Sequence, residues 1–238
     1  MLKLKIILFL VFPFFINAQN EKISAEKLKQ DLTIFKEIRK KANSGVYKYR
    51  TPKQIDSIYS WAFLQINKPK TLLDFYKIIL KITDFEGSLH NDTTLPDEFL
   101  NKFSSGNVFF PYPVKLIEDK LVINFQNSEI PIGSQIYSIN KIKTNKIIKD
   151  FNKYYTTYNI SGKSIGINSS FAKYFEIEYG SKKKFAVEYS LPNKTEKITK
   201  TVAGVSNDSR KENFKKRHSL PIDSLQYGKI KNKYSFQV

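Results

Sequence analysis

The chain has 238 residues, a formal charge of +18 and no cysteine. A chain without cysteine has no disulfide framework, no thiolate metal site and no cysteine nucleophile. Hydrophobic residues make up 41% and aromatic residues 14% of the sequence, which is enough for packed cores in one or two domains and excludes global disorder.

The first residues have the pattern of a secretory signal peptide. Lys3 and Lys5 precede an apolar run, Ile6 to Ile16, that is too short to cross a bilayer, and Ala18 offers a small residue before a cleavage site. We therefore expect residues 1–18 to be a cleaved signal peptide of a secreted or periplasmic bacterial protein with no stable membrane anchor. An uncleaved anchor helix is the alternative.

Three amphipathic helices are predicted between residues 24 and 82. Ser24, Thr51 and Thr71 are N-cap candidates, and Gln54 completes a capping box with Thr51. Behind each cap, apolar residues recur at helical spacing, and short links between the helices favour a small bundle. A polar loop, 84–94, and a short helix, 96–103, complete a helical N-terminal domain that we place at residues 19–106.

The pattern then changes to the alternation that is typical of strands. Val114 to Phe125 is predicted to form a hairpin, and Pro111 and Pro113 favour an edge position for its first strand. A further strand ending at Asn140 and a helix over 144–155 follow.

Beyond that helix, the sequence around Gly162 is predicted to break the chain. Three more strands are expected at 171–179, 185–191 and 195–202. We assign residues 107–205 to a small β domain. The polar, basic segment from Ser206 onward reads as a linker, so that the predicted fold class is α+β.

Few residues offer catalytic chemistry. The sequence has no phosphate-binding glycine loop, nucleophile elbow or zinc-protease motif, and we expect no metal and no cofactor. His90 lies in the polar loop with Ser88 and Asp92, where a histidine can act as a general base because its pKa is near neutrality. A histidine that only braces the loop is the alternative.

The positive charge raises the question of a polyanion partner. Lysines are spread along every predicted element, and local clusters occur only at 182–184 and 210–217. A solvated, lysine-rich surface explains this distribution, so we expect no nucleic-acid partner, while a polyanion- or surface-binding protein stays as an alternative.

A small sheet with an exposed edge beside a helix, as the pattern from Phe109 predicts, can accept an extended peptide by strand addition. Main-chain hydrogen bonds supply affinity, and a pocket between strand and helix reads a side chain or a terminal carboxylate. A β domain without a ligand fits the same pattern.

Residues 130–140, with a Pro/Gly turn, a strand and Asn140 before the helix at Thr144, resemble the PDZ-like module of the C-terminal-processing (tail-specific) serine protease family. Lys141 stands where the family usually has glycine. The resemblance implies a PDZ-like β domain whose peptide-binding residues include Ile132, Gly133, Ser134 and Ile136.

Three earlier segments, 45–49, 74–76 and 87–93, are similar to the secreted bacterial branch of the same family, and the likeness covers about residues 25–238. It implies that His90 serves a catalytic serine in a following domain. Residues 206–238 would then link to the start of that domain, which the sequence lacks.

The expected protein is thus the non-catalytic front part of such a peptidase. It would bind a peptide or unfolded protein substrate, with a separate protease domain as a partner, and would not itself hydrolyse peptides. A stand-alone periplasmic binding or scaffold module is the alternative without a protease link.

Overall fold

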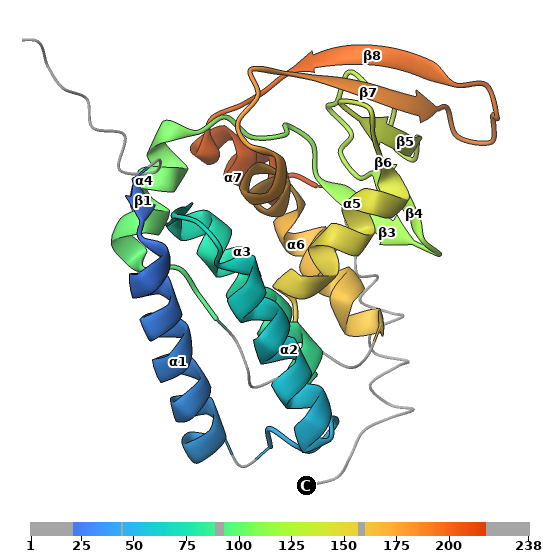
Figure 1. Cartoon of the computed structure of the whole chain (residues 1–238). Helices are drawn as coiled ribbons and strands as arrows, with labels where there is room; N and C mark the ends of the chain where they lie inside the picture. Colours follow the sequence, from blue (N-terminus) through green and yellow to red (C-terminus); the bar gives the residue numbers. More distant parts are fainter. Residues whose placement is uncertain (1–20, 44, 89–92, 157–159, 218–238) are drawn as a thin grey trace, which may run out of the picture. The chain divides into compact units, whose positions relative to one another are not determined.

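The computed structural model describes residues 21–43, 45–88, 93–156 and 160–217 (Figure 1). Its helices and antiparallel strands confirm the α+β class. The chain divides into an N-terminal unit that ends at Ile82 and a C-terminal unit that begins at Thr83. The predicted domain limits, 19–106 and 107–205, stay predictions.

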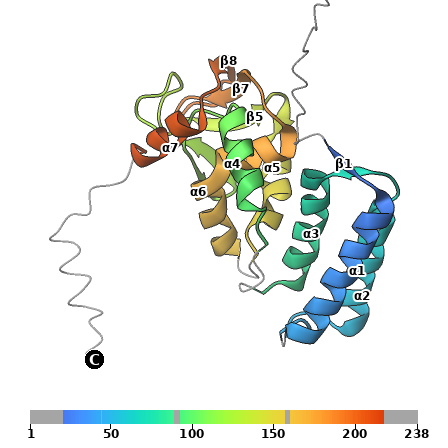
Figure 2. The ribbon, with the colours of Figure 1, turned by 90° about the vertical axis from the view of Figure 1, so that its left-hand side faces the viewer.

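The N-terminal unit contains α1 (Ala25–Ala42), α2 (Pro52–Gln65) and most of α3 (Leu72–Glu86), with β1 (Lys22–Ile23) paired to β2 (Lys70–Thr71). Helices α1 and α2 lie side by side (Figure 2). The stripe predicted for α2 is buried, and it comprises Ile55, Ile58, Tyr59, Ala62 and Ile66. On α1, Leu28 and Leu32 are buried, but Ile38 is 57% exposed, contrary to expectation.

The three predicted caps are confirmed. The Ser24 hydroxyl accepts a hydrogen bond from the Lys27 backbone nitrogen at 3.3 Å, and Thr71 accepts one from Asp74 at 3.1 Å. Thr51 and Gln54 form the reciprocal capping box. These local signals therefore place the three helix starts correctly.

Helix α3 continues to Glu86, so the predicted loop does not begin at Asp84. Thr83 and Glu86 are buried and continue the helical spacing of Ile79 and Ile82. The sequence pattern missed this last turn because Thr83 and Glu86, which occupy its inward positions, are polar. Apolar periodicity alone ends at Ile82.

The C-terminal unit is built on one antiparallel sheet with the strand order β3-β4-β5-β7-β8, and β6 also pairs with β5. The strands are β3 (Val114–Ile117), β4 (Lys120–Ile123), β5 (Gln135–Ile139), β6 (Ile142–Lys143), β7 (Lys184–Ser190) and β8 (Ile198–Ala203). Strand β3 lies at one edge, as its neighbouring prolines predict.

Two tight turns set the register of this sheet. Glu118 and Asp119 have positive φ values of 48° and 61° in the β3–β4 turn, and Asn140 and Lys141 have 51° and 66° after β5. Lys141 thus adopts the left-handed conformation that glycine takes most easily. The Asn140 side-chain oxygen accepts a 2.9 Å hydrogen bond from the Ala186 nitrogen, which ties this turn to β7.

The predicted strand at 171–179 and the break at 161–163 are wrong, because both lie within α6 (Ile160–Tyr179). Phe171, Phe175 and Tyr179 are four residues apart, so they share one helix face as well as alternating in the sequence. The pattern was therefore compatible with either structure. The helix has a kink at Ser170, where φ is −130°.

Packing of aromatic side chains between α6 and the sheet selects the helix over the strand at residues 171–179. The Phe110 ring centre lies 5.6 Å from that of Phe171 and 5.4 Å from that of Phe185 on β7. Phe151, at the end of α5 (Thr144–Phe151), lies 5.4 Å from Phe171. Helix α5 passes into the short helix η2 (Asn152–Tyr154), which shortens the predicted helix at 144–155.

Two further helices differ from their predictions. Helix α4 (Asp97–Gly106) extends three residues beyond Phe103. Helix α7 (Asn207–Lys215) forms where we expected a linker, and the Ser206 hydroxyl caps it by accepting a hydrogen bond from the Ser209 nitrogen at 3.2 Å. Its polar composition concealed the helix, because Phe214 is its only large apolar residue.

Candidate functional site

The free edge of β3 is the starting point of the candidate site. Asn124 donates a backbone hydrogen bond to the Pro113 carbonyl at 2.9 Å, and Lys115 pairs with Val122 two residues later. Because hydrogen-bonded and non-bonded pairs alternate in an antiparallel ladder, the backbone groups of Val114 and Leu116 point away from β4. These groups are available to an added strand or to side chains beside the edge.

A side chain of α6 already bonds this edge. The Leu116 backbone nitrogen donates to the Asn168 side-chain oxygen at 2.6 Å. The Asn168 oxygen therefore occupies the place that a carbonyl of an added strand would take. Helix α6, and not the predicted helix at 144–155, is the helix that borders the edge.

Helix α7 contacts the chain just before β3. The Asn213 side-chain nitrogen donates to the Pro111 carbonyl at 2.9 Å. At the start of the helix, Phe109 and Val205 exchange backbone hydrogen bonds of 2.8 and 3.0 Å. Strand β3, α6 and α7 thus enclose one groove in the C-terminal unit, and Figure 1 shows α7 beside α6.

The groove has a wide end and a narrow end. The wide end is a cavity of about 370 Å³ lined by Val114, Lys115, Asn124, Ile165, Asn168, Ser169, Phe214 and Arg217. The narrow end, of about 20 Å³, is lined by Phe110, Pro111, Tyr112, Pro113, Val114, Asn168, Ser169, Phe171, Ala172, Arg210 and Phe214. Both ends share Val114, Asn168, Ser169 and Phe214, so they adjoin each other.

Exposed apolar residues occur on α6, at the wide end, and at the end of β3. Ile165 on α6 is 62% exposed, and Ile117 at the end of β3 is 46% exposed. Large apolar side chains beside an open strand edge favour binding of a chain with apolar side chains.

The charge of the groove is positive. Lys115, Arg210 and Arg217 line it, and no acidic residue is among the described residues that do so. Arg210 stacks over the Phe109 ring at 5.2 Å, and burial lowers its pKa. Burial also lowers the pKa of Lys173 on α6, and the positive charge of Arg210 adds to this effect. In the described part of the chain, neither Arg210 nor Lys173 forms an ion pair.

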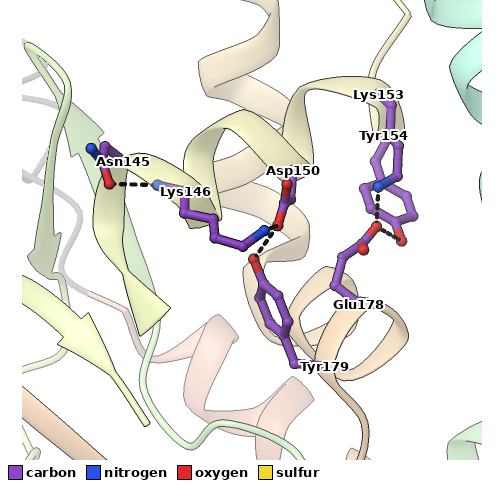
Figure 3. Close-up of polar contacts among 7 residues, drawn as sticks. All are labelled: Asn145, Lys146, Asp150, Lys153, Tyr154, Glu178 and Tyr179. Atoms are coloured by element: carbon purple, nitrogen blue, oxygen red, sulfur yellow. Dashed lines mark hydrogen bonds and ion pairs between the residues drawn. The ribbon is translucent and has the colours of Figure 1, made fainter. Parts of the chain in front are cut away.

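Polar contacts hold α6 against α5 and η2 (Figure 3). Asp150 accepts hydrogen bonds from Lys146 at 2.6 Å and from the Tyr179 hydroxyl at 2.7 Å. Burial raises the pKa of Asp150, but these hydrogen bonds outweigh it and lower the pKa overall. Glu178 forms an ion pair with Lys153 and accepts a 2.6 Å hydrogen bond from the Tyr154 hydroxyl. These contacts fix the helix that carries Asn168.

A buried acid lies on the same helix. Glu176 is 5% exposed, and burial raises its pKa from 4.5 to about 7, against the opposing charge of Lys182. A carboxyl group with this pKa changes its charge near neutrality.

The residues predicted to bind a peptide lie away from this groove. Ser134 and Ile136 are 0% and 1% exposed, and β5 is paired on both sides, so this stretch has no free edge. Gly133 is in a turn with φ of 79°, and Ile132 is half-buried. Ile136 borders a polar cavity of about 290 Å³, with Lys120, Lys143 and Lys197, on another part of the sheet.

His90 lies outside the described residues, so its predicted catalytic role stays a prediction. Sequence reasoning placed β3 at an edge of the sheet, but it expected another helix beside that edge and missed Asn168 and Asn213. Neither asparagine stands in a motif, and only the packing of α6 and α7 brings them to β3.

Two further features concern the described residues alone. They contain no group of histidine or acidic side chains placed to hold a metal ion. None of their helices has the length and apolar character needed to span a bilayer.

No family model and no curated protein matches the chain. Among solved structures, the chain is similar to mature CPAF, which is the chlamydial protease-like activity factor, a serine protease. The identity is 13% and the TM-score is 0.43, and the match covers 76% of this chain and 34% of that chain. Mature CPAF complexed with lactacystin is 12% identical with a TM-score of 0.46, over 76% and 35%. The chain spans about a third of their length, and a likeness at this level assigns no family.

Proposed function

We propose that the C-terminal unit binds an extended peptide as an added strand on β3. The observation that carries this proposal is the hydrogen bond from the Leu116 nitrogen to the Asn168 side chain, which imitates the bond that a peptide carbonyl would make. The flanking groove gives room for side chains of the bound peptide.

The groove favours a peptide with an apolar side chain and a carboxylate nearby. Ile165 and Val114 provide apolar contact at the wide end, and Lys115 on β3 provides positive charge there. An acidic side chain or a free C-terminus supplies the complementary charge.

The wider role of the chain rests on its sequence motifs. We propose that it is secreted after cleavage at Ala18 and serves as the recognition part of a tail-specific serine peptidase. N-terminal sequencing of the secreted protein tests the cleavage, with Gln19 as the expected first residue. Reading the coding sequence after Val238 tests the link to a peptidase, which an in-frame catalytic domain would support.

Peptide binding can be tested by fluorescence anisotropy. The probe is a fluorescein-labelled unstructured decapeptide with two apolar residues at its end and a free C-terminal carboxylate, together with its amidated twin. We expect saturable binding of the probe and weaker binding of the amidated twin. Failure of both peptides, and of a twin with an internal aspartate, to bind would contradict the proposal.

A matched pair of proline variants locates the binding edge. Leu116→Pro removes an outward N–H from β3 and leaves the β3–β4 ladder intact, so it should abolish binding. Thr201→Pro removes an outward N–H from β8, the opposite edge, and should leave binding unchanged. Equal effects of both variants would show that β3 is not the binding edge.

A further inference from the structure

We infer that α7 is an internal competitor that closes the narrow end of the groove and must withdraw before a peptide on β3 can extend past Val114 alongside residues 110–113. This inference rests on the proposed peptide binding. It concerns the regulation of that site rather than its existence.

The contacts of α7 place it where a long peptide would run. Phe214 borders both ends of the groove, and Arg210 lines the narrow end. Asn213 donates to the Pro111 carbonyl, so that a side chain of α7 bonds the backbone that leads into β3. The narrow end has about 20 Å³ of space with α7 in place, too little for a further residue of a bound chain.

The attachment of α7 is weak. It has nine residues, none of which is buried, and a helix of this length has little stability of its own. Its anchors are the Asn213 bond, the half-buried Phe214 ring and the stacking of Arg210 on Phe109.

Electrostatics also oppose the closed position. Arg210 on α7 and Lys173 on α6 are both half-buried cations, and neither has an acidic partner among the described residues. A carboxylate that entered the groove would find Lys115 on β3 still in place after α7 had left. Ligand binding can therefore shift the equilibrium from the closed to the open arrangement.

The test compares Phe214→Ala with Lys211→Gln, an exposed position on α7, using the same decapeptide in about 0.5 M salt to screen exposed charges. We expect Phe214→Ala to bind the peptide about tenfold more tightly than the wild type. Loss of the Phe214 ring weakens the docking of α7, and this raises the population of the open state that binds the peptide. Lys211→Gln should bind like the wild type.

The outcomes separate the two proposals. If the wild type binds and Phe214→Ala binds equally or more weakly, α7 is a wall of the groove and the inference fails while peptide binding stands. If neither protein binds, both proposals fail.

Hydrogen exchange gives a second measurement that does not depend on a variant folding. In the wild type, amides of residues 207–215 should exchange faster when the decapeptide is present, and the Leu116 amide should exchange more slowly. Slower exchange of residues 207–215 with peptide would overturn the inference.

Discussion

The side-chain oxygen of Asn168 lies 2.6 Å from the backbone nitrogen of Leu116 and closes an otherwise free strand edge. An unpaired row of backbone groups at an edge invites association with other chains. Here α6 supplies an acceptor from a side chain, and under the proposed strand addition a peptide carbonyl would take its place.

We predict that Asn168→Ala lowers the free energy of unfolding of the C-terminal unit by about 1 kcal/mol, because the Leu116 N–H loses its acceptor. Urea unfolding followed by far-UV circular dichroism measures this change. Asn168→Asp should cost less, because its carboxylate can still accept the bond. Asn101→Ala, at an exposed position of α4, is the control and should have little effect. Equal stability of Asn168→Ala and the control would contradict the role of this bond.

A second prediction concerns the capping box of α2. Thr51→Ala removes the acceptor for the Gln54 nitrogen and should lower the free energy of unfolding of the N-terminal unit by about 1 kcal/mol. Trp61, the only tryptophan in the sequence, lies on α2 and reports this transition by fluorescence. Thr33→Ala is the matched control, since Thr33 bonds only the Lys29 carbonyl within α1 and should be nearly neutral. A similar loss in both variants would show that the cap contributes nothing specific.

Local signals predicted much of this fold. Caps at Ser24 and Thr51, the hairpin turn at Glu118 and the edge prolines all depend on residues close in sequence, so the sequence alone locates them. The edge position of β3 was also predictable, because prolines beside a strand favour an edge of the sheet.

What the sequence did not reveal depends on contacts between distant residues. The stretch from Phe171 to Tyr179 satisfies both strand and helix periodicity, and only packing against Phe110 and Phe185 selects the helix. Helix α7 has no apolar stripe that a sequence pattern could reveal. One of its contacts with the rest of the unit is made by Asn213, which bonds Pro111 across about a hundred residues of sequence. The groove walls are therefore tertiary features, and their residues carry no local pattern.

A third prediction concerns Gly166 within α6. Glycine to alanine in a helix is usually stabilising by about 1 kcal/mol. At Gly166, however, an added Cβ would lie 2.7 Å from the Tyr155 Cβ and ring atoms, so the substitution should destabilise the C-terminal unit despite the better helix propensity.

Thermal unfolding monitored by circular dichroism tests the sign of this effect. Gly45→Ala is the control, because its added Cβ would meet only one side-chain atom, at 3.4 Å. We expect the unfolding temperature to fall for Gly166→Ala and to change little for Gly45→Ala. A higher unfolding temperature for Gly166→Ala would show that Tyr155 can move aside.

The last prediction concerns the pH dependence of stability through Glu176. Burial raises its pKa from 4.5 to about 7 in the folded chain, so the unfolded chain releases this proton at lower pH. Burial of this carboxyl group therefore does not lower the free energy of unfolding below about pH 4.5. The loss of stability grows as the pH rises to about 7 and is complete above it. Allowing for relaxation around the charge, we expect the full cost to be about 1–3 kcal/mol.

Glu176→Gln should therefore be more stable than the wild type at pH 8 and should differ little from it at pH 4.5, because the wild-type carboxyl is then largely protonated in the folded chain. Urea unfolding of both proteins across this range, with Glu196→Gln as a control for the loss of one exposed negative charge, measures the difference. The decisive quantity is the slope of the stability difference between pH 4.5 and 7, since it reports the protons that only the unfolded chain has released. A difference that is the same at both pH values would mean that Glu176 does not titrate in this window, and that the substitution acts through packing alone.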